Sequence, residues 1–79
     1  MITVEVSPED AQHVLWQFGH PAGRQPGSFT QLLIQAAMKA DPGNLARLAE
    51  GFPSMVGAVE ATRIVGGIDF LVQVVEGRR

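Results

Sequence analysis

The sequence contains no cysteine. The chain therefore forms neither a disulfide nor a thiolate metal site, the usual supports of small folds, and it gives no indication of a redox compartment. Its two histidines, His13 and His20, are separated by a predicted helix end and have no acidic residue at ligand spacing, so we expect no metal ion and no cofactor. A chain of 79 residues buries only about 60 to 65% of its unfolded surface, and we expect oligomerisation to supply the missing support.

Basic residues are also few. The chain has six Lys and Arg residues, two of which are Arg78 and Arg79, and its formal net charge is −2. This composition provides no positive field for a phosphate backbone, so we do not expect nucleic-acid binding. No stretch approaches the ~20 apolar residues of a membrane span, and the first ten residues lack the basic start of a secretory leader. We expect no membrane partner and a cytoplasmic location.

Residues arranged for catalysis are lacking as well. Ser28, His20 and Asp41 have the side chains of a catalytic triad, but Ser28 and Asp41 flank one predicted helix and lie ~18 Å apart at 1.5 Å per residue. The other acidic residues stand singly on predicted outer faces: Glu50, Glu60, Asp69 and Glu76. No pair of carboxylates is available for acid–base chemistry. We expect no catalytic residue and no enzymatic activity.

Residues 26–44, PGSFTQLLIQAAMKADPGN, combine a helix start, a long amphipathic run and a stop. They predict the central helix of the fold. Ser28 and Gln31 have the spacing of a capping box, which fixes the start near Phe29. Asp41-Pro42 ends this helix and opens the next one. At about 100° per residue, one broad apolar face contains Phe29, Leu32, Leu33, Ala36, Ala37 and Ala40.

The same periodicity places Ile34 and Met38 on the opposite side of this helix, as a second apolar stripe. We interpret the stripe as a contact for a partner subunit, with packing under a terminal segment of the same chain as the alternative. Trp16 likewise points away from the inward face of the first helix. It is either covered by the loop that follows or serves as an aromatic anchor for a partner.

The remaining segments define the fold class. Residues 2–6, ITVEV, alternate as in a short β-strand. Ser7 as cap and Pro8 at the first helical position predict a helix that ends at Gly19 with a left-handed cap. Two further helices are predicted over residues 42–50 and from residue 53 up to Gly66-Gly67, whereas residues 68–75 fit a helix or a strand. We expect a mainly α single domain, residues 1–79, with four to five helices and a short N-terminal β-strand.

Residues 19–27, GHPAGRQPG, form a loop of nine residues before the predicted central helix. His20 and Arg24 stand just before free backbone N–H groups and the positive end of a helix dipole, which favour an anion. Together with Gly27 and Ser28 they form a candidate site for a phosphate or carboxylate. The alternative is that the glycines and prolines only form turns, because their spacing matches neither the Walker loop nor the dinucleotide fingerprint.

Three stretches, VSPEDAQHVLWQFG, PGSFTQLL and ADPGNLARLAEGFPSMVGAV, resemble a family of small uncharacterised proteins of actinobacteria and their bacteriophages. The resemblance covers nearly the whole chain, and Trp16, the PGSF turn and the Phe52-Pro53 turn carry it. It implies a phage or phage-derived cytoplasmic accessory protein and favours helix for residues 68–75. It implies no activity and assigns no functional residue.

These observations predict a small non-enzymatic accessory protein that acts by protein–protein interaction as a homo-oligomer, with a dimer favoured. Its interface candidates are Trp16, Ile34 and Met38. A host or phage protein is a further candidate partner. The alternative function is the binding or sequestration of a small phosphorylated molecule or nucleotide by loop 19–28 and the N-terminus of the predicted central helix.

Overall fold

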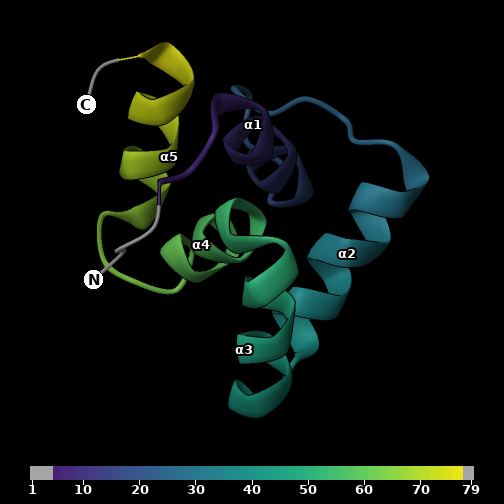
Figure 1. The fold of residues 1–79 in the computed structure, drawn as a ribbon. Helices are drawn as coiled ribbons and strands as arrows, with labels where there is room; N and C mark the ends of the chain where they lie inside the picture. Colours follow the sequence, from purple (N-terminus) through teal and green to yellow (C-terminus); the bar gives the residue numbers. More distant parts are fainter. Residues whose placement is uncertain (1–4, 78–79) are drawn as a thin grey trace.

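The computed structural model describes residues 5–77, which form five α-helices and no strand (Figure 1). The helices are α1 (Pro8–Gln17), α2 (Ser28–Lys39), α3 (Pro42–Gly51), α4 (Pro53–Ala61) and α5 (Gly67–Glu76). The prediction of a mainly α fold is thereby confirmed. Helix α4 packs against each of the other four helices, and α5 packs along α1.

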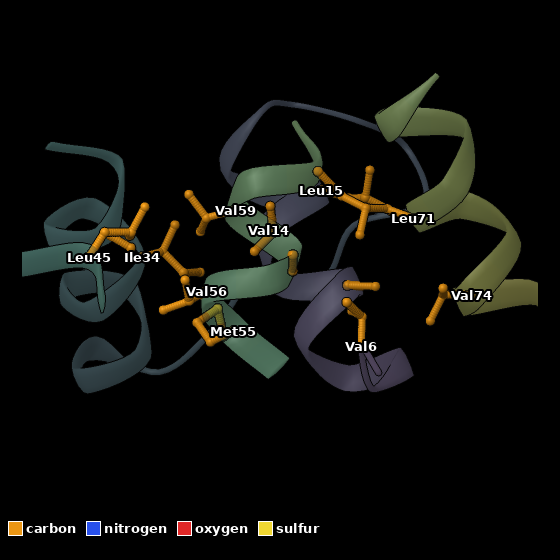
Figure 2. Close-up of a cluster of buried hydrophobic side chains, with 14 residues drawn as sticks. Val6, Val14, Leu15, Ile34, Leu45, Met55, Val56, Val59, Leu71 and Val74 are labelled. Carbon is orange, nitrogen blue, oxygen red and sulfur yellow. The ribbon is translucent and has the colours of Figure 1, made fainter. Parts of the chain in front are cut away.

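Helix α4, rather than α2, is the central helix. Most of its residues are buried: Met55, Val56, Gly57, Ala58, Val59 and Ala61. Because α4 has several neighbours, the middle of its sequence, Met55 to Val59, is buried and apolar throughout, and Glu60 is exposed. Figure 2 shows the core extending across α4, from Ile34 and Leu45 on one side of the helix to Leu71 and Val74 on the other.

The prediction of an N-terminal strand is wrong for the part of it that the structure describes. Glu5 and Val6 belong to no strand, and residues 2–4 lie outside the described range. Val6 is 2% exposed and joins the apolar core through its side chain alone (Figure 2). A strand requires a second strand for its backbone bonds, and residues 5–77 contain none.

The C-terminal segment forms α5, so the helical alternative for residues 68–75 is confirmed. Leu71 and Val74 are buried, while Ile68 and Val75 pack against the core more peripherally. This spacing matches the 3.6-residue period, which directs these side chains toward one side of a helix. Packing against α1 and α4 therefore outweighs the strand preference of the β-branched residues.

Two of the three predicted N-caps are confirmed. Ser7 Oγ accepts a hydrogen bond from the Asp10 N–H at 3.1 Å, and Asp41 Oδ1 accepts one from the Asn44 N–H at 2.8 Å. The predicted capping box at Ser28 is wrong. The N-cap of α2 is Gly27, because its carbonyl accepts the first helical hydrogen bond, from the Gln31 N–H at 2.9 Å. No side chain caps this helix.

We predict that Ser7→Ala lowers the free energy of unfolding by about 0.5 to 2 kcal/mol, because it removes the acceptor of a helix-terminal N–H. Ser28→Ala is the matched control, since the exposed Ser28 caps nothing, and it should change this free energy by less than about 0.5 kcal/mol. Chemical denaturation of both variants measures the difference. Equal losses for the two serines would contradict the assigned caps.

The turn between α4 and α5 depends on a close approach at Gly67. A Cβ atom added there would overlap the carbonyl oxygen of Ala61, a backbone atom at the end of α4. The preceding Gly66 has a φ of 79°, in the left-handed region that glycine occupies without steric cost. Together these two residues reverse the chain within a few positions and bring α5 back onto α1.

We predict that Gly67→Ala lowers the free energy of unfolding by about 1 to 3 kcal/mol, because backbone must shift to admit the methyl group. Gly51→Ala is the control. A Cβ at Gly51 meets nothing within 4 Å, and restricting the unfolded chain should raise stability by up to about 1 kcal/mol. Thermal and urea unfolding measure both values, and an unchanged stability for Gly67→Ala would contradict the described turn.

Candidate functional site

Helix α2 is rotated relative to the prediction. Ile34, expected to face outward, is fully buried together with Ala37, whereas Phe29 and Leu32, expected to face inward, are each 65% exposed. The apolar residues of α2 occupy an arc too wide for one neighbouring helix to cover. The periodicity of the apolar residues predicts which residues belong to such an arc, but it does not predict which edge of the arc packs against the core. Helices α1 and α4 contact α2 and bury the edge with Ile34.

The uncovered edge of α2 continues onto α3. We call the exposed apolar surface formed by Phe29, Leu32, Ala36, Leu48 and Phe52 the α2–α3 face. The rings of Phe29 and Phe52 lie 6.1 Å apart between centroids, at 53° between planes, a separation at which aromatic pairs interact favourably. The two aromatic residues therefore form one surface, although Phe29 belongs to α2 and Phe52 is the cap residue between α3 and α4.

The α2–α3 face is large for a chain of this size. A phenylalanine side chain offers about 150 to 250 Å². With Phe29 and Leu32 each 65% exposed and Phe52 40% exposed, these three residues leave roughly 300 Å² of apolar surface uncovered. The largest apolar patches on monomeric proteins reach this size and are often functional.

A groove between α2 and α3 adjoins the face. Its volume is about 410 Å³, and its lining residues are Ala36, Lys39, Ala40, Asn44, Arg47 and Leu48. A second depression, of about 310 Å³, lies at the aromatic end of the face and includes Asp10, Phe29 and Phe52 in its wall. The two ends thus differ in shape and in charge, with two basic side chains at the groove and an acidic one beside the rings.

Met38 is 36% exposed, in agreement with the outward orientation predicted for it. Its carbonyl oxygen accepts a hydrogen bond from Arg63 Nη2 at 2.7 Å, which links the end of α2 to the segment after α4. Val65, on the turn between α4 and α5, is also fully exposed. Val65 adjoins the exposed Ile64. Exposed apolar residues in ones and twos are common on protein surfaces, so we assign no site to Met38 or Val65.

Trp16 is half-buried, and the loop that follows α1 returns across it. A Cβ atom at Gly23 would overlap the backbone of Trp16, and the Arg24 N–H donates to the Gln12 carbonyl at 3.0 Å. The loop therefore runs back along α1. Of the two predicted roles of Trp16, the structure favours coverage by this loop.

Two residues of the candidate anion site, His20 and Arg24, contact other residues of their own loop and of α1. His20 Nδ1 accepts a bond from the Ala22 N–H at 3.0 Å, and the Arg24 guanidinium lies 3.9 Å from Glu9 Oε2. His13 Nδ1 and the Arg24 carbonyl oxygen are 2.9 Å apart, and the ring nitrogen donates because a carbonyl only accepts. These contacts orient the loop on α1.

Gly27 and Ser28, the other two residues of the candidate anion site, are exposed at the start of α2. The contacts described above for His20 and Arg24 do not connect them with either residue. The four residues lie in one chain segment, but the contacts given above do not join them into a cluster around an anion position. Anion binding at this loop stays a prediction.

Within residues 5–77, no group of three or more His, Asp or Glu side chains is placed to hold a metal ion. No helix of that range has the length and apolarity to cross a membrane. The chain matches no protein-family model, no curated protein and no solved structure. Among the residues that the structure describes, the α2–α3 face brings together three exposed large apolar side chains, Phe29, Leu32 and Phe52.

We predict that Gly23→Ala displaces the loop from α1 and shifts the fluorescence emission of Trp16 to longer wavelength, because the added methyl group overlaps the Trp16 backbone. The chain has a single tryptophan, so the signal is unambiguous. Gly27→Ala is the control, since a Cβ there meets nothing within 4 Å, and its spectrum should match the parent. Identical spectra for all three proteins would contradict the described loop packing.

Proposed function

We propose that this protein is a small non-enzymatic accessory protein that acts by protein–protein interaction as a homo-oligomer, in which the α2–α3 face binds a second copy of the chain. The observation that carries the proposal is the exposure of Phe29 and Leu32, each 65%, on one side of α2 and in continuity with Phe52. Covering roughly 300 Å² of apolar surface contributes on the order of 7 kcal/mol per copy before the costs of association.

The composition of the face supports a protein partner. Stable complexes bury about 800 Å² on each side, with an apolar centre and a polar rim. Here the rings and Leu32 supply the centre, and exposed or half-buried polar side chains of α2 and α3 supply the rim: Gln31, Gln35, Lys39, Asn44 and Arg47. A second copy is the partner that every solution of the protein contains, and symmetric pairing buries the same face on both copies.

The proposed setting follows the resemblance to small proteins of actinobacteria and their phages. A phage-type accessory protein in the host cytoplasm would use the α2–α3 face for its own assembly, and a host or phage protein is a further candidate for the same surface. The alternative function, ligand binding by loop 19–28, has no contact in its favour among the described residues. We therefore propose one function.

We predict a mass in solution near twice 8.5 kDa by light scattering at micromolar concentration. Phe29→Ser combined with Leu32→Ser should shift the mass to that of the monomer, because the apolar centre of the interface is removed. Helical circular dichroism should persist, since both side chains are exposed in the single chain.

Val65→Ser is the matched control for this experiment. Val65 is as exposed as a residue can be, but it lies on the turn between α4 and α5, outside the α2–α3 face. Its substitution removes apolar surface without touching the proposed interface, so the mass should stay that of the dimer. A monomeric parent protein at high concentration, or a dimer that survives the double substitution in α2, would refute the proposed function.

A further inference from the structure

We infer that two copies pair with their α2 helices antiparallel about a two-fold axis that passes near the middle of α2; the inference rests on the proposed function. The α2–α3 face has two unlike halves. One half carries the exposed rings of Phe29 and Phe52, which form part of the wall of the depression of about 310 Å³. The other half is recessed, with Ala36 and Ala40 in the wall of the groove of about 410 Å³.

The order of these halves along α2 makes the face complementary to itself. Phe29 and Ala40 are eleven residues apart, which is roughly 16 Å along a helix. Antiparallel pairing lays the Phe29 end of each copy over the alanine end of the other, where small side chains permit close approach of the backbones. A two-fold interface requires this kind of self-complementarity. In a parallel pair the aromatic ends of the two copies would face each other, and the groove between α2 and α3 would stay empty in both copies.

The charges favour the same arrangement. Lys39 and Arg47 line the groove at the recessed end, and Asn44 Oδ1 accepts a bond from Arg47 Nη1 at 3.0 Å, which orients the guanidinium. Asp10 lines the depression at the other end of the face, beside Phe29 and Phe52. Antiparallel pairing brings the Asp10 end of each copy to the Lys39 end of the other, whereas parallel pairing opposes like charges. Complementary charges of this kind set the orientation of a complex.

A charge exchange tests the orientation. Lys39→Asp and Asp10→Lys should each raise the dissociation constant of the dimer about tenfold at low ionic strength, because each places like charges together at two symmetric positions. The combined variant should return to within about threefold of the parent, because both attractive contacts re-form with their signs exchanged. Sedimentation equilibrium measures all four constants.

Two controls keep the test decisive. Glu60→Lys makes the same change of charge as Asp10→Lys on an exposed position of α4 outside the face, and its dissociation constant should match the parent. Asp10 lies in the first turn of α1, where a lysine opposes the helix dipole. If circular dichroism shows that this variant is unfolded, the neutral pair Asp10→Asn and Lys39→Gln replaces it, and the two losses should be strongly non-additive.

The outcomes separate this inference from the proposed function. A parent dimer that Phe29→Ser and Leu32→Ser dissociate, but in which the exchanged charges restore nothing, overturns the antiparallel order and leaves the proposed function intact. A monomeric parent overturns both. Restoration by the double charge exchange, with Glu60→Lys unchanged, establishes the antiparallel pairing.

Discussion

The burial of most of α4 among the other four helices is the constraint on which those helices depend. This helix has nine residues (Pro53–Ala61), of which six are buried. Gly57, Ala58 and Ala61 have small side chains or none, so the backbones of neighbouring helices can approach the axis of α4 closely. The overlap that a Cβ at Gly67 would make with Ala61 shows how little space remains at its end. A helix this short offers each neighbour a contact of only about two turns.

The exposed face of α2 follows from that limited contact. Helix α2 has twelve residues and apolar side chains over a wide arc, but α4 accommodates only the edge that carries Ile34 and Ala37. Helix α3 turns away after Asp41 and leaves a groove instead of covering Ala36 and Ala40. Phe29 and Leu32 therefore stay outside the core of the single chain. The exposed apolar surface of α2 therefore arises because its apolar arc is too wide for one neighbouring helix to cover.

Local signals in the sequence predicted the parts of the fold that local chemistry determines. Ser7 and Asp41 were predicted as caps because each is followed by proline at the first helical position, and both accept the expected N–H bond. Each of these assignments concerns one helix and its own ends.

The errors concern relations between elements. The rotation of α2 depends on which neighbour meets its wide apolar arc, and the sequence of α2 does not contain that information. A strand at Glu5 and Val6 would have required a partner strand, and α5 left none in the C-terminal segment. The exposed apolar edge was therefore predicted on the correct helix but on the wrong side of it, because Ile34 is buried and Phe29 and Leu32 are exposed.

The most direct test of the account is a dilution series followed by backbone amide nuclear magnetic resonance. If the α2–α3 face binds a second copy, dilution from millimolar to low micromolar concentration should shift or narrow the resonances of residues 29–40 and 44–52. Those of α5 should stay constant, because α5 packs within its own chain. Resonances that do not change with concentration, or changes confined to α5 and the turn before it, would contradict the claim that the exposed edge of α2 is an interface.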